Sequence, residues 1–138
     1  MSTARTWNTS TDESVVSEVQ QIDDFLNIER EVFEEASRKN QLICSIEIER
    51  DDDWTLAVSY ASEALAMLTV VQPPGSQSWS TRARPGRSAI EVGIFNFMGS
   101  WSEADGNWFV PLGDAHVGIE AFLSGTDPMD ERLSWSVD

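Results

Sequence analysis

Few side chains in this sequence have the chemistry that catalysis requires. The one histidine, His116, falls in the first turn of a predicted helix, where a surface or capping role is the simplest interpretation. The one cysteine, Cys44, occupies an inward position of a predicted strand and is interpreted as a small buried hydrophobe. No glycine-rich phosphate loop follows a strand, and the residue spacing matches neither a zinc site nor a calcium loop. The sequence therefore predicts a protein without catalytic residues, metal or cofactor.

Tryptophans that lie beside carboxylates in predicted turns indicate protein binding instead. A large ring can anchor a partner protein while neighbouring carboxylates meet its arginines and lysines. Packing of each ring within its own loop is the competing interpretation. The predicted contact residues form two groups, with Asp51, Asp52, Asp53 and Trp54 in one loop and Trp101, Glu103 and Asp105 in another.

The net charge of −15, from 24 acidic and nine basic residues, restricts the class of partner. A chain this acidic repels phosphate backbones, so direct nucleic-acid binding is not expected. Long-range attraction speeds its encounter with a basic protein, although solubility alone also explains an acidic surface. Arg82, Arg84 and Arg87 cluster in one loop, and we expect them to pair with acidic groups of the same chain.

Three features of the sequence predict a cytoplasmic protein that does not contact membranes. There is no run of about 18 apolar residues of the kind that spans a bilayer. The first residues, "MSTARTWNTSTDES", lack the apolar core of a secretory signal. Cys44 cannot form an internal disulfide on its own, which suits a reducing compartment.

Apolar periodicity divides the chain into a few elements. Residues 1–13 are polar and are expected to be flexible, and residues 14–138 are predicted to form a single domain. A helical stripe runs through "SVVSEVQQIDDFLNIEREVFEEASRK", after which Asn40 can leave the helix in a left-handed conformation. Alternation of apolar and polar residues predicts the strands, at 42–50, 55–62, 64–72, 90–99, 108–111 and 132–137. The Ala, Leu and Met residues of 64–72 would also suit a short helix.

The remaining segments connect these strands. Residues 72–89 hold prolines and glycines and are expected to form an irregular loop, while residues 100–107 are expected to form a turn. Asp114 is predicted to cap a second helix that ends at Gly125.

Together the elements predict an α+β fold. A mostly antiparallel sheet of about five or six strands would pack against two helices. The closing strand is expected to place Leu133 and Trp135 in the core beside the second helix.

An order of short motifs over residues 90–136 resembles the Imm1 family of bacterial immunity proteins. The order is a strand ending in glycine ("FNFMG"), a turn, an aromatic-Val-Pro segment ("WFVP"), a helix ending "EAFLSG", a turn with proline ("TDP") and a terminal Leu-Ser-Trp. A helix around "IDDFL" that leads into a strand is similar to the N-terminal layout of the family. The chain departs from the family in the longer spacing between Pro128 and Trp135 and in the Arg/Pro loop before residue 90.

The resemblance implies an antidote that protects the producing cell and its siblings from an interbacterial toxin. Toxins paired with this family are often nucleic-acid deaminases, whose substrate surface needs basic and aromatic groups. An acidic antidote would occupy that surface and inhibit by stoichiometric binding, without turnover. The shared motif would then be mainly scaffold, and specificity is expected in the loops.

Two other functions are compatible with the sequence. One is an acidic adaptor or nucleic-acid mimic that binds a basic host protein and no toxin. The other is an enzyme that uses the carboxylates near Trp101, which would require a deep pocket with convergent acids.

Overall fold

In a computed structural model the chain forms an α+β fold, described for residues 2–73, 77–83, 90–130 and 133–138. The strands are β1 Ser2–Asn8, β2 Glu13–Val19, β3 Ile46–Arg50, β4 Thr55–Ser62, β5 Leu65–Val71, β6 Ser78–Arg82, β7 Val92–Phe97, β8 Ser100–Asp105, β9 Val110–Pro111 and β10 Ser134–Val137. The helices are α1 Ile22–Lys39 and α2 Leu112–Leu123, with short 3-10 helices η1 Gly106–Trp108 and η2 Pro128–Asp130.

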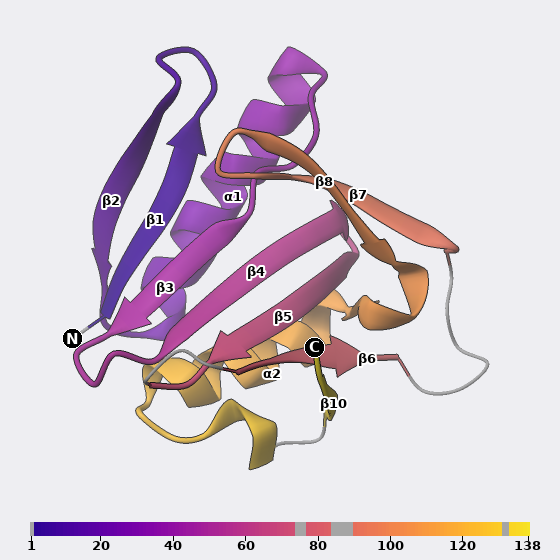
Figure 1. Ribbon diagram of the computed structural model, residues 1–138. Coiled ribbons are helices and arrows are strands. Elements are labelled where there is room, and N and C mark those ends of the chain that lie inside the picture. The colour runs from indigo at the N-terminus through magenta and orange to yellow at the C-terminus, as the bar shows by residue number, and fades with distance from the viewer. Residues whose placement is uncertain (1, 74–76, 84–89, 131–132) are drawn as a thin grey trace.

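One sheet dominates the fold. Within the described residues it has eight strands, of which seven follow the order β10-β6-β5-β4-β3-β1-β2 while β9 pairs with β5. The pairings between these strands are antiparallel. β7 and β8 form a second, two-stranded sheet (Figure 1). The α+β class and the mostly antiparallel sheet are therefore confirmed, with more strands than the five or six expected.

The two helices cover one face of the main sheet. Alternate side chains of β3, β4 and β5 point to this face, where Ile48, Leu56 and Leu68 are fully buried. Phe25 of α1 and Ile119 of α2 pack into the same core. Burying one such side chain stabilises the fold by about 1.5–3 kcal/mol. The other face carries the β7–β8 hairpin, with a second core of Met67, Phe95 and Phe109.

The N-terminal residues form a strand where the sequence predicts a flexible segment. β1 pairs with β2 on one side and with β3 on the other. Ala4 lies opposite Ser17 in one ladder and opposite Ile48 in the other, and it is buried. Ladder hydrogen bonds to strands on both sides hold this polar segment in the sheet, where the sequence predicts a loose segment.

The predicted start of the first helix is wrong. Residues 13–19 form β2, in which Val19 is the buried residue. α1 begins later, after a capping box in which Gln21 and Asp24 exchange hydrogen bonds between side chain and backbone. It ends as predicted at Asn40, which takes a left-handed conformation with φ of 52°.

Part of the loop predicted at 72–89 is a strand. Ser78–Arg82 forms β6, which lies between β5 and β10. Arg82 lies 3.7 Å from the carboxylate of Asp138 and 4.3 Å from the ring centre of Trp108, so it pairs within the chain as predicted. Arg84 and Arg87, for which the same pairing is predicted, lie outside the described residues.

The second helix begins earlier than predicted. Pro111 immediately precedes α2, and Asp114 lies within its first turn instead of capping it. A carboxylate in the first turn still interacts favourably with the positive end of the helix dipole. The helix ends at Leu123, and Gly125 follows with φ of 84°, close to the predicted end.

The chain closes on a strand, as predicted, and this strand lies at the edge of the main sheet beside β6. Leu133 and Trp135 are partly buried against the main core. The carboxylate of Asp138 accepts hydrogen bonds from the hydroxyls of Ser78 and Ser80, at 2.7 and 2.8 Å. The end of β10 is therefore fixed by side chains as well as by its ladder.

Candidate functional site

The first group of predicted contact residues forms the turn between β3 and β4. Asp51, Asp52 and Asp53 are exposed, whereas Trp54 is partly buried against the main core. Two backbone hydrogen bonds close the turn, from the N–H of Asp53 to the carbonyl of Arg50 at 3.1 Å and from the N–H of Arg50 to the carbonyl of Trp54 at 2.9 Å.

Arg50 joins this turn to the end of α2. Its guanidinium donates to the Asp52 carboxylate at 3.1 and 2.9 Å, and to the carbonyls of Phe122 and Thr126 at 3.0 and 2.9 Å. It also lies 5.0 Å from the ring centre of Trp54. The hydrogen bonds from Arg50 lower the pKa of Asp52. Asp52 therefore has a structural role that the sequence did not indicate, and Trp54 packs within the fold as the competing interpretation expects.

The second predicted group lies on β8 and not in a turn. The turn of this hairpin is Met98-Gly99, whose φ values of 49° and 90° suit a two-residue hairpin connection. Gly99 is required there, because a Cβ would lie 2.8 Å from the indole of Trp7. The predicted turn at 100–107 is thus wrong, since Ser100–Asp105 is strand β8 and Asp105 caps the short helix η1 that begins at Gly106.

Alternation along β8 places Trp101, Glu103 and Asp105 on one exposed face of the hairpin. The Trp101 side chain is 64% exposed. In the antiparallel register, Glu103 lies opposite Ile94 and Asp105 opposite Val92. Both of these β7 residues are exposed, Val92 at 49%. We call these five residues the hairpin outer face.

The opposite side of the hairpin is anchored to the sheet. Phe95 packs edge to face with Phe109, with ring centres 6.2 Å apart. Near the turn of the hairpin, Asn96 exchanges backbone hydrogen bonds with Ile43 and Ser45, at 3.2 and 2.7 Å. A groove of about 280 Å³ remains between β7–β8 and the sheet, lined in part by Glu47. The outer face is therefore presented by an element that the fold holds in place.

The structure separates the two predicted groups. Near its turn, the hairpin contacts the segment just before β3, through a bridge between Asn96 and Cys44. The turn with Asp51 and Asp53 follows the other end of β3 (Figure 1). Within the second group, Glu103 and Asp105 lie side by side on an exposed face and not at the bottom of a pocket.

Sequence reasoning missed Val92 and Ile94 as members of this surface. The sequence predicts their strand, and because both are apolar residues at alternate positions, the pattern alone does not mark them as part of a surface. The partner strand β8 was predicted as a turn, which hid the register that brings them beside Glu103 and Asp105.

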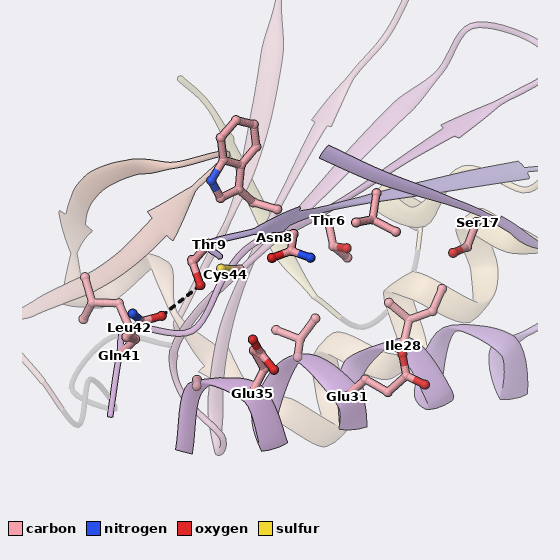
Figure 2. A pocket seen from close by; sticks show the side chains of 14 residues that line it. Thr6, Asn8, Thr9, Ser17, Ile28, Glu31, Glu35, Gln41, Leu42 and Cys44 are labelled. Atoms are coloured by element: carbon pink, nitrogen blue, oxygen red, sulfur yellow. Dashed lines mark hydrogen bonds between the residues drawn. The ribbon is translucent and has the colours of Figure 1, made fainter. Parts of the chain in front are cut away.

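A cleft of about 230 Å³ lies between the β1–β2 hairpin and α1 (Figure 2). Thr6 and Ser17 line it from the strands, and Ile28, Glu31 and Glu35 from the helix. The hydroxyl of Thr9 donates to Gln41 at 3.1 Å across one end. The sequence does not indicate this cleft, because most of β2 falls within the predicted first helix.

A buried carboxylate joins the two helices to the sheet. Glu29 of α1 accepts from the Tyr60 hydroxyl at 2.6 Å and lies 2.8 Å from Nε2 of His116. His116 is therefore a partner of a core carboxylate, where the sequence predicts a surface or capping residue. Burial is the main reason that the pKa of Tyr60 lies well above its ordinary value, with the nearby charge of Glu29 acting in the same direction.

The remaining reactive groups are dispersed. Cys44 is buried as predicted, and burial raises the pKa of its thiol. Within the described ranges, no group of three or more His, Cys, Asp and Glu side chains is arranged to hold a metal ion. Neither α1 nor α2, the two α-helices of the described residues, has the length and apolar character needed to cross a membrane.

Comparison of the chain with models of protein families, with curated proteins and with solved structures finds no match. The geometry of the exposed surfaces is therefore the basis for a functional conclusion.

Proposed function

We propose that this protein is an immunity protein that neutralises a cognate interbacterial toxin by stoichiometric binding. The observation that carries the proposal is the hairpin outer face, where an exposed tryptophan and two apolar side chains lie beside two carboxylates. The resemblance of residues 90–136 to the Imm1 family supports it, and so does the net charge of −15.

The outer face has the composition of a protein-binding surface. Trp101 offers a large ring that a partner can bury, and aromatic anchors of this kind dominate many interfaces. Val92 and Ile94 extend the apolar contact, while Glu103 and Asp105 are placed to meet arginines or lysines. A toxin that acts on nucleic acid has a basic substrate surface, and a face of this kind would cover it.

The acidic turn between β3 and β4 contributes at longer range. Asp51 and Asp53 are exposed there, and the Arg50–Asp52 pair holds the turn in a fixed shape. Charges outside the direct contact raise the rate of encounter with a basic partner. We therefore assign this turn to steering and the hairpin outer face to anchoring.

Co-expression with the product of the neighbouring reading frame tests the proposal, because an antidote gene is expected beside its toxin gene. We expect growth rescue and co-purification of the two proteins. Trp101→Ala should weaken binding by about 30-fold or more, as loss of a central anchor does. Glu103→Lys should slow association and reduce its dependence on salt.

Matched controls are available on α2. Val117 is an exposed apolar residue there and Glu120 an exposed carboxylate, so Val117→Ala and Glu120→Lys make similar changes away from the hairpin. Both should leave binding unchanged. Wild-type affinity in Trp101→Ala would contradict the proposed surface, and binding to a basic host protein without growth rescue would favour the adaptor function.

A further inference from the structure

β2 presents an open edge of the main sheet to solvent. It pairs with β1, and no other strand of the described residues pairs with its second side. Its residues 13–18 are all exposed, with Val15 at 45% and Val16 at 57%. Such an edge offers backbone N–H and C=O groups with which another strand can pair.

This edge lacks most of the features that protect exposed strands from pairing. Residues 13–19 contain no proline and no lysine, and the β1–β2 register runs without a bulge from Ser2 opposite Val19 to Asn8 opposite Glu13. Its centre is Val15-Val16, and valine favours β-structure. The charges on the edge are those of Glu13 and Glu18, so they favour an incoming strand that is basic.

The cleft beside β2 offers contacts for the side chains of an added strand. Val15 and Ser17 line the cleft, so alternate side chains of a strand paired with β2 would lie over it. α1 forms the other wall with Ile28 and Glu31 (Figure 2). Glu35 is paired with Arg38 and Lys39, whereas no arginine or lysine of the described residues pairs with Glu31.

We propose that the β2 edge and this cleft bind an extended segment of a partner protein that carries both apolar and basic side chains on the face turned toward the cleft. The segment adds to the sheet as a further strand beside β2. Its apolar side chains contact Val15 and Ile28, and a lysine or arginine pairs with Glu31. This surface shares no residue with the hairpin outer face, so the inference stands apart from the toxin contact proposed there.

Charge argues against a second copy of this chain as the occupant. Two chains with a net charge of −15 each repel one another. If two β2 strands paired antiparallel with Val15 opposite Val16, Glu13 of each strand would lie opposite Glu18 of the other, and like charges directly opposite one another are destabilising. A basic segment is instead attracted both by the net charge of the protein and by Glu13 and Glu18 of the edge.

A capped peptide, seven residues long to match β2, is the probe. Its first, third, fifth and seventh residues are valine, lysine, valine and lysine, so both kinds of side chain lie on one face, and threonine occupies the other positions. We expect it to slow amide hydrogen exchange in β2 and to shift the NMR signals of Ile28 and Glu31. Two further peptides carry N-methyl groups on one or the other set of alternate backbone nitrogens and keep the same charge. The one whose methyl groups face β2 should bind about tenfold more weakly, because it cannot donate to the edge.

A pair of charge reversals on α1 completes the test. Glu31→Lys, within the cleft, should weaken peptide binding by about tenfold, whereas Glu34→Lys makes the same charge change on the exposed helix surface outside the cleft and should alter it by less than about twofold. Equal effects of the two reversals, or equal binding of both methylated peptides, would overturn strand addition. A dimer of the free protein in sedimentation, with β2 amides already protected, would identify a second copy as the occupant and overturn it too.

Discussion

At the scale of single residues, side chains distant in the sequence complete one another's hydrogen bonds inside the fold. Glu29 binds Tyr60 and His116, and Arg50 binds the carbonyls at the end of α2. Such partners cannot be predicted from one sequence, because Glu29 is the one buried acid among several on α1, and the sequence pattern does not distinguish it from the others. The sequence correctly places Cys44 inside and Asn40 at the end of α1, since both depend on local pattern.

The raised pKa of Tyr60 predicts how the free energy of unfolding changes at alkaline pH. Its folded pKa is raised above the ordinary value of 10.0, so it stabilises the fold fully below about pH 10, and this contribution is lost as the pH rises above that value. Cys44, whose pKa is also raised, contributes a similar loss from lower pH. We expect the free energy of unfolding to fall in this range, and to fall less steeply in Tyr60→Phe.

The measurement is direct because Tyr60 is the one tyrosine of the chain. Its ionisation, followed by ultraviolet absorbance, should coincide with unfolding followed by circular dichroism. Tyrosinate that forms in a protein with native circular dichroism would show that the hydroxyl is not buried as described.

At the scale of elements, strands with one buried face and one more exposed face could be predicted from the sequence. Strands whose two faces are similarly exposed could not. β3 alternates buried and less buried residues throughout, β4 and β5 do so along part of their length, and their sequence pattern reports this. β2 is exposed over 13–18, so its valines could be fitted to a helical period. β8 alternates Trp101 with serine and carboxylates, which resembles a polar turn until the register with β7 is known.

The close packing of Gly106 against the backbone of Ile90 predicts that a larger residue at this position destabilises the fold. A Cβ at this position would overlap the carbonyl oxygen of Ile90 and lie 2.6 Å from its carbon, and backbone cannot move aside easily. Gly106→Ala should therefore lower the free energy of unfolding by about 1–3 kcal/mol or more, measured by urea denaturation.

Gly113→Ala is the matched control, since a Cβ there meets nothing within 4 Å. It should leave stability unchanged or raise it slightly, because alanine favours a helix. Equal stability of the two variants would mean that the start of η1 is not packed as closely as described.

At the scale of the whole molecule, the sheet is built from both ends of the sequence. β1 and β10 lie far apart in the sheet order, and each joins it through a partner remote in the chain. The sequence predicted the class of fold and the closing strand. It did not predict which strands form the edges of the sheet. It therefore did not predict the cleft beside β2 either.

Deletion of residues 133–138 tests the contribution of the closing strand. It removes the β6–β10 ladder, the packing of Leu133 and Trp135 and the bonds of Asp138. We expect loss of cooperative thermal unfolding, followed by circular dichroism. A shortened chain that melts as the full chain does would show that this strand is dispensable.

The two faces of the β7–β8 hairpin have different roles, and this affects which of its residues can change during evolution. Phe95 and Gly93 on the inner side pack against the body of the fold, with Gly93 directly beneath the ring of Phe109. Val92, Ile94 and Trp101 on the other side support none of that packing. These exposed side chains can therefore be exchanged during evolution while the inner packing, and with it the ability to fold, is kept.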